Sequence, residues 1–118
     1  MINSDTPDIL KDIVELKRAR VEERKKAFSL LELENLISKA EKPLNFSGRL
    51  MGDGIRVIAE VKRASPSKGV LKEGLDAANL ARAYAENGAA AISVLTNEDH
   101  FKGSIDDMVT AHSAVFTL

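Results

Sequence analysis

The fold is decided by one run of sequence, VIAEVKRASPSKG, which occupies residues 57–69. Its first half is apolar and rich in β-branched residues, which is typical of a buried strand. Glu60 interrupts that run, and burying a charge inside an apolar strand is costly unless the charge is paired or used. The run then turns basic and polar. We therefore expect a strand whose carboxyl end carries a functional site.

Glu60 and Lys62 form the centre of that site. Side chains alternate across a strand, so these two share one face, about 6 to 7 Å apart along the strand. At that spacing an acid and a base can shift each other's pKa and flank a small substrate. The alternative is a structural ion pair at a sheet edge, and composition alone leaves both open. The Ser-Pro-Ser-Lys-Gly turn that follows adds hydroxyls and a cation, which favours a site.

The elements around this strand predict an α/β fold. In chain order they are a strand at 55–61, a helix at 76–86, a strand at 90–95, a loop at 96–103 and a helix from 104 or 105 to about 112, with 114–118 leading into a third strand. Alternating strands and helices imply parallel strands joined by right-handed crossovers. Because two or three parallel strands leave open edges and a poorly covered face, we expect this chain to be the beginning of something larger.

Residues 1–50 predict a helical extension. Thr6 is a good N-cap for a first helix, and Ser29 and Glu32 have the spacing of a capping box that opens a second helix ending near Lys39. The charged run at 17–26 indicates a solvated helix face rather than an RNA-binding patch. The domain organisation that we expect is therefore an extension at 1–50 followed by two βα units at 51–118.

Composition excludes several classes of function. The net charge of −1 gives no electrostatic support for a nucleic acid or an anionic membrane as partner. The absence of cysteine excludes disulfides and fits a reducing compartment, and no secretory signal precedes the first helix, so we expect a cytoplasmic protein. The sequence spacing of His100 and His112 does not match that of metal ligands, so no metal site is expected.

The strand and its loop resemble the signature of indole-3-glycerol-phosphate synthase. That signature is a glutamate, one residue, a lysine, two residues, then Ser-Pro-Ser followed by a glycine. The likeness continues through residues 76–84, 87–96 and 101–104. The charged N-terminal helices are also similar to the extension that precedes the barrel in this family. The resemblance covers nearly the whole chain up to about Asp107.

The resemblance implies a (β/α)8 TIM barrel with a helical N-terminus. It implies a carboxy-lyase of tryptophan biosynthesis, which converts 1-(2-carboxyphenylamino)-1-deoxyribulose 5-phosphate into indole-3-glycerol phosphate by ring closure, decarboxylation and dehydration. No metal or organic cofactor is implied.

The resemblance also assigns roles. Glu60 is the carboxylate that orients and polarises catalytic groups, and Lys62 holds the anionic substrate. Ser65 lines the same pocket, and Phe101 contacts the ring system of the substrate. From its sequence context alone, Phe101 is a lone aromatic in a charged loop and favours packing on the protein.

The chain departs from the family in length. A complete barrel needs roughly 250 residues, and the lysine-bearing third strand, the later catalytic glutamate and the phosphate-binding loops of the family have no counterpart here. We therefore expect the isolated 118-residue chain to be inactive. Two alternatives remain open: a non-catalytic barrel fragment that self-associates through open strand edges, and another phosphate-handling TIM barrel. The spacing of Glu60, Lys62 and the Ser-Pro-Ser turn argues against the second.

Overall fold

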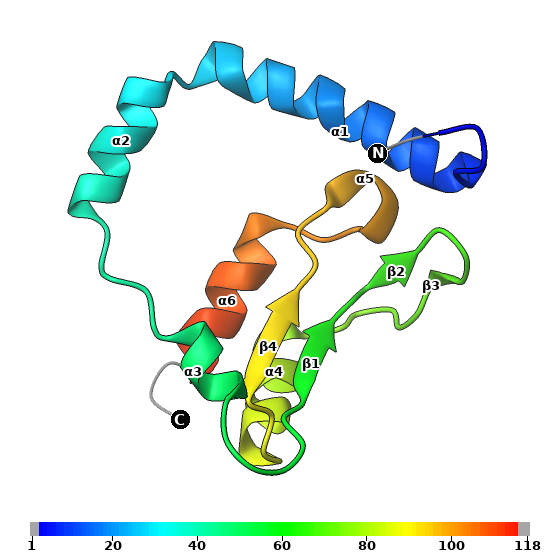
Figure 1. Ribbon diagram of the computed structural model, residues 1–118. Helices are drawn as coiled ribbons and strands as arrows, with labels where there is room; N and C mark the ends of the chain where they lie inside the picture. Colours follow the sequence, from blue (N-terminus) through cyan, green and yellow to red (C-terminus); the bar gives the residue numbers. More distant parts are fainter. Residues whose placement is uncertain (1–2, 116–118) are drawn as a thin grey trace. The chain divides into compact units, whose positions relative to one another are not determined.

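The protein divides into two compact units between Pro43 and Leu44. The structure, a computed structural model, describes residues 3–115 (Figure 1). The first unit contains two helices, and the second contains all the strands. The candidate site therefore belongs to the second unit.

The helices of the first unit are α1 (Asp8–Ala27) and α2 (Leu30–Lys39). The predicted capping box of α2 is confirmed, because Ser29 and Glu32 each bond the other's backbone N–H. The prediction that Thr6 caps α1 is wrong. Its hydroxyl instead bonds Asn3 in the preceding turn, and Pro7 stands at the cap position.

The core of the second unit is a parallel pair of strands, β1 (Ile58–Val61) and β4 (Ala91–Val94). The predicted parallel pairing is confirmed, with Glu60 opposite Ser93 in the register. The strand β1 begins three residues later than the sequence indicated, because 55–57 lie outside the ladder.

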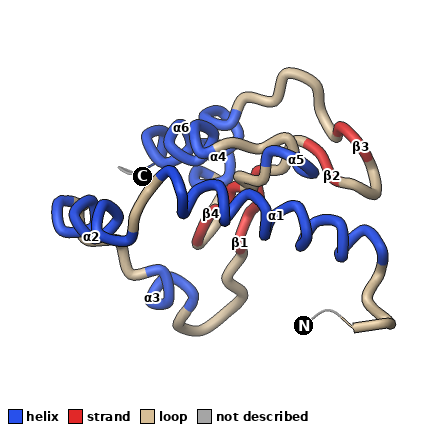
Figure 2. The backbone as a smooth tube through the Cα atoms, turned by 90° about the horizontal axis from the view of Figure 1, so that it is seen from above, coloured by secondary structure: helices blue, strands red, loops and turns tan. Residues whose placement is uncertain are grey.

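Two helices, α4 (Ala77–Glu86) and α6 (Ile105–Val115), pack together and cover one face of this strand pair (Figure 2). The predicted cap of α4 is confirmed, since the Asp76 side chain accepts a hydrogen bond from the backbone of Asn79. Val61 points into the covered face and is 2% exposed, together with buried alanines of both helices. Ile58 and Glu60 point to the other face, where Ile58 is 48% exposed.

Four short elements were not predicted. The helix α3 (Phe46–Leu50) is capped by Asn45, whose side chain accepts a hydrogen bond from the backbone N–H of Gly48. A small antiparallel hairpin pairs β2 (Ala64–Ser65) with β3 (Gly69–Val70), and a one-turn helix, α5 (Glu98–Phe101), interrupts the second loop.

The last helix is longer than the sequence indicated. Because α6 continues to Val115, the expectation that 114 and 115 lead into a strand is wrong, and 116–118 lie outside the described residues. Within residues 3–115, no helix combines the length and the apolar composition that crossing a membrane requires.

Candidate active site

Glu60 and Lys62 meet at the carboxyl end of β1. The Lys62 Nζ lies 3.5 Å from a carboxylate oxygen of Glu60, so the sequence correctly placed the two side chains together. The expectation that Glu60 is buried is wrong, because its side chain is 42% exposed and that of Lys62 is 35% exposed. The reason is that the helices α4 and α6 pack on the opposite face of the β1–β4 pair, the face of Val61, and leave Glu60 exposed. The pair is open to solvent and to a ligand.

Ser65 lies in β2, three residues after Lys62, at the base of the hairpin. Its hydroxyl accepts a 3.2 Å hydrogen bond from the backbone N–H of Lys68 and lies 3.4 Å from the Ser67 hydroxyl. Ser65 thus holds its own turn, and among the described residues no hydrogen bond joins it to Glu60 or Lys62. It is half-buried at the same end of the sheet as the ion pair.

Phe101 ends α5 and is half-buried. The helix α5 packs against β2, so Phe101 and Ser65 stand on adjoining elements that follow two neighbouring strands. The side chain of Asn97 caps α5 by accepting a 2.8 Å hydrogen bond from the backbone of His100. The structure therefore brings both loops to one end of the strand pair, while among the described residues no hydrogen bond links Phe101 with the ion pair.

The sequence reasoning missed a second ion pair at this end. Arg63 follows Lys62 and donates from Nε to Asp107 Oδ2 at 2.7 Å and from a terminal nitrogen to Oδ1 at 2.8 Å. A third donor of the same guanidinium reaches the carbonyl of Leu75. Asp107 lies 44 residues away in the first turn of α6, so no local pattern could have indicated the pair.

This second pair is less exposed than the first, with the side chains of Arg63 and Asp107 28% and 15% exposed. The guanidinium bond holds the pKa of Asp107 below its usual range, and partial burial opposes that shift. The same bond raises the pKa of Arg63. Both groups are therefore charged throughout the physiological range, and the two-pronged geometry is of the strong, directional kind.

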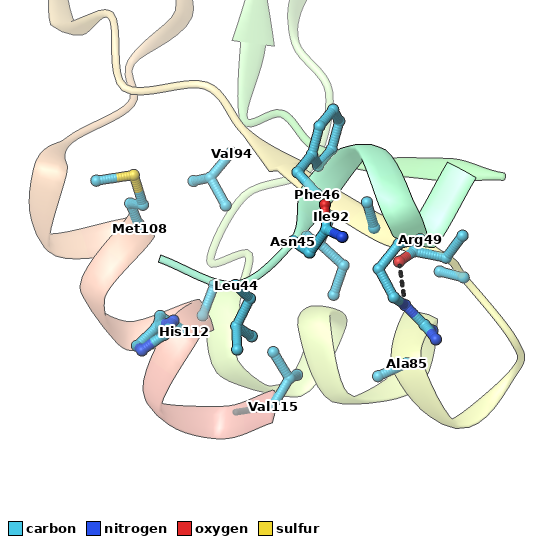
Figure 3. Close-up of a pocket in the computed structure, with 14 residues that line it drawn as sticks. Leu44, Asn45, Phe46, Arg49, Ala85, Ile92, Val94, Met108, His112 and Val115 are labelled. Carbon is cyan, nitrogen blue, oxygen red and sulfur yellow. Dashed lines mark hydrogen bonds between the residues drawn. The ribbon is translucent and has the colours of Figure 1, made fainter. Parts of the chain in front are cut away.

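A cavity of about 670 Å³ lies elsewhere in the second unit (Figure 3). Ile92 and Val94 line it from β4, Phe46 from α3 and Met108 from α6, and the Arg49 Nε donates a 3.2 Å bond to the Ala90 carbonyl at its side. None of the four predicted site residues contributes to its lining. It is largely apolar and is on the helix-covered face of β4, so we do not assign it to the ion-pair site.

The described residues offer no metal centre. Within 3–115, no three or more histidine or acidic side chains gather in a way that could hold an ion. The chemistry available at this site is that of one carboxylate, one ammonium, nearby hydroxyls and an aromatic ring on the adjoining loop. Such a set can bind an anion and share proton-transfer work with a bound substrate.

Comparison with known proteins gives a consistent result. Residues 10–118 match the family model described as indole-3-glycerol phosphate synthase. A protein of that name from Mycobacterium sp. (strain KMS) is 47% identical over 107 residues, as is one from Mycolicibacterium smegmatis, and one from Mycobacterium avium is 48% identical. Each alignment covers 91% of this chain and 39% of the relative, so the chain spans well under half the length of these proteins.

Proposed function

The chain belongs to the indole-3-glycerol phosphate synthase family, and we propose that it supplies the first part of the active site of such an enzyme. The enzyme would act on a phosphorylated small molecule, 1-(2-carboxyphenylamino)-1-deoxyribulose 5-phosphate. The observation that carries the proposal is the 3.5 Å approach of Lys62 to Glu60 at the carboxyl end of β1, followed by the Ser-Pro-Ser turn.

In the proposed reaction, the ring carbon that bears the carboxylate attacks the ketose carbonyl carbon, and the carbonyl oxygen takes up a proton to become a hydroxyl group. The ring carboxylate then leaves as carbon dioxide, and loss of water gives the indole. The substrate carries negative charge, so its carboxylate competes with Glu60 for the Lys62 ammonium. Once Lys62 holds substrate, the Glu60 carboxylate is free to orient and polarise groups at the reacting carbonyl.

Ser65 and Phe101 would complete the substrate contacts. The Ser65 hydroxyl can donate to a substrate oxygen while its lone pairs hold the backbone of Lys68. The ring of Phe101, carried on α5 against β2, would lie against the aromatic ring of the substrate. No cofactor is invoked, since ring closure, decarboxylation and dehydration exchange no electrons with a second molecule.

For the architecture, we propose the start of a (β/α)8 barrel preceded by a helical extension. Residues 1–50 would form the extension and 51–118 the first two βα units. The parallel pair β1–β4, with α4 and α6 on one face, supports this arrangement. The uncovered face of Glu60 and Ser93 would then be the barrel interior, which opens at the carboxyl ends of the strands. We assign the protein to the cytoplasm, where such primary metabolism takes place.

The test is a chimera in which this chain replaces the aligned part of the Mycolicibacterium smegmatis relative. We expect it to convert the substrate into a product with indole fluorescence. Glu60→Gln and Lys62→Met should each lower kcat/KM at least about 100-fold, the order of magnitude of general acid–base effects. The control is Glu86→Gln, an exposed acid at the end of α4. Full activity of both site variants would refute the assignment.

One observation favours a second candidate, a non-catalytic fragment that self-associates. The backbone N–H groups of Ala91 and Leu95 bond to β1. The backbone groups of Ile92 and Val94 therefore point away from β1, along the open edge of β4 beside the apolar cavity. The isolated 118-residue chain would then form dimers. Sedimentation equilibrium at several concentrations tests this, and a monomer at about 100 μM would exclude it.

A further inference from the structure

Ser93 is the one polar residue in the apolar run AAAISVL, which occupies residues 89–95. In β4 it lies directly opposite Glu60 of β1 in the parallel register. The residues on either side of it, Ile92 and Val94, line the cavity on the helix side of the strand (Figure 3), and side chains alternate along a strand. Ser93 therefore shares the face of Glu60, about 5 Å away across the strand pair.

The Ser93 hydroxyl makes no hydrogen bond to any residue in the range 3–115. Two other serines of this range, Ser65 and Ser104, are half-buried like Ser93, and each accepts a bond from the backbone N–H three residues further on. The Ser93 oxygen is not sealed from solvent, since the buried side-chain atom without a partner in this range is the Nδ1 of His100. The hydroxyl is therefore open to a partner on the face of Glu60.

Two neighbours on its own face can hold the Glu60 carboxylate. Lys62 follows two positions along β1, and its Nζ lies 3.5 Å from a carboxylate oxygen. Ser93 lies opposite, across the strand pair. The Glu60 side chain is 42% exposed and rotates about three bonds, so the carboxylate can turn from Lys62 to Ser93 while the strands stay in place.

We propose that Ser93 is a positioning residue that becomes the partner of the Glu60 carboxylate when substrate binds. The inference rests on the proposed function, in which the substrate carboxylate draws the Lys62 ammonium away from Glu60. A carboxylate that has lost its cation is a strong acceptor, so the Ser93 hydroxyl donates to one of its oxygens. The other oxygen then faces the reacting carbonyl in a fixed direction. Ser93 does not touch the substrate, and it keeps its proton throughout.

The alternative is a serine that only fills its place in the strand. Two substitutions separate these roles, because threonine and valine have nearly the same shape and both favour strands. Ser93→Thr keeps the hydroxyl, and Ser93→Val removes it. A residue with a packing role alone would give the same result for both variants.

The first test is kinetic and uses the chimera with the Mycolicibacterium smegmatis relative. Ser93→Val should lower kcat about tenfold or more relative to Ser93→Thr, the order of magnitude of one hydrogen bond to a charged group. KM should stay within about twofold, because Ser93 acts on Glu60 rather than on the substrate. Equal kcat values for the two variants would overturn the role. A loss confined to KM would overturn it too, since that result marks a direct contact with substrate.

The second test needs no turnover and follows the side-chain carboxyl 13C resonance of Glu60 by NMR in the 118-residue chain. With Lys62 in place, Ser93→Thr and Ser93→Val should give the same resonance, because Lys62 holds the carboxylate. In a Lys62→Met background the two variants should differ, since the hydroxyl is then the donor opposite Glu60. Identical resonances in that background would overturn the role even if the chimera is active. An inactive chimera with two distinct resonances would refute the proposed function and leave the pairing of Ser93 with Glu60 standing.

Discussion

The Tyr84 hydroxyl donates a 2.9 Å hydrogen bond to the backbone carbonyl of Glu60. The carbonyls of Val57 and Val61 accept hydrogen bonds from the segment of β4. Successive carbonyls of a strand point in opposite directions, so the carbonyl of Glu60 points away from β4, to the outer edge of β1. A side chain of α4 therefore occupies an acceptor that a neighbouring strand would otherwise use. The same bond fixes the backbone of the residue that we assign to catalysis.

Replacing Tyr84 by phenylalanine removes only that hydroxyl. The ring stays in place, so we expect a loss of about 0.5–1.5 kcal/mol in the free energy of unfolding, the usual net contribution of one hydrogen bond. Urea denaturation measures the loss, with an unchanged m-value because the buried surface is unchanged. The backbone 13C resonance of the Glu60 carbonyl should shift as well. A variant without any change in that resonance would show that the bond does not form in solution.

The Arg63–Asp107 pair predicts an acid-sensitive contribution to stability. The pKa of Asp107 is lowered in the folded state, so its stabilisation is present above the unfolded value, about 3.9, and is lost as the pH falls through the folded value. Asp107→Asn should therefore cost about 1.5–3 kcal/mol at pH 7, the range for a charged hydrogen bond.

Denaturation of the wild type and of Asp107→Asn over the acid range checks the sign. The difference between them should shrink as the pH falls from 5 towards 2. A difference that is constant across this range would contradict the charged pair and would point to packing as the origin of the loss.

Gly103 predicts a steric effect. A β-carbon at this position would lie only 1.9 Å from the carbonyl oxygen of Leu95, and that oxygen belongs to the backbone, which cannot move aside cheaply. We expect Gly103→Ala to cost about 3 kcal/mol or more, among the large effects known for single substitutions. The matched control is Gly88→Ala, where nothing lies within 4 Å and only the positive φ of 93° is strained, at a cost of about 1–2 kcal/mol. Equal losses in thermal melts would argue against the close crossing of Gly103 and Leu95.

The two faces of β1 predict unequal effects of the same truncation. Val61 is 2% exposed beneath the helices, so Val61→Ala should destabilise by about 2 kcal/mol. Ile58→Ala removes a larger side chain from the uncovered face and should cost under about 1 kcal/mol. Chemical denaturation of both variants reads out the difference. The opposite order would mean that the helices cover the other face.

The elements that sequence predicted well are those with local signals. The caps at Ser29 and Asp76 depend on side chains within three residues of the bonds that they make. The parallel order of β1 and β4 followed from an intervening amphipathic helix, which constrains the connection. The approach of Lys62 to Glu60 followed from alternation along one strand.

The elements that sequence missed depend on contacts made elsewhere. The hairpin of Ala64–Ser65 with Gly69–Val70 is too short to leave a periodic pattern, and α5 is a single turn that packs on that hairpin. The exposure of Glu60 was misjudged because burial of a strand face depends on what covers it, which an apolar run does not specify. The pairing of Arg63 with Asp107 could not be predicted from the sequence for the same reason, since only the folded chain brings the two side chains together.

The Leu71 N–H donates to the Arg63 carbonyl and the Arg63 guanidinium donates to the Leu75 carbonyl, so the tip of the β2–β3 hairpin lies outside both contacts. These contacts fix the separation of β1 and α4 at the base of the hairpin. Residues 66–68 at its tip do not affect that separation. Inserting or replacing residues at the tip would change the loop beside the strand ends, but it would not change the spacing of the strands. Residues 66–68 are therefore the part of this connection that tolerates changes of length and composition while β1 and α4 keep their positions.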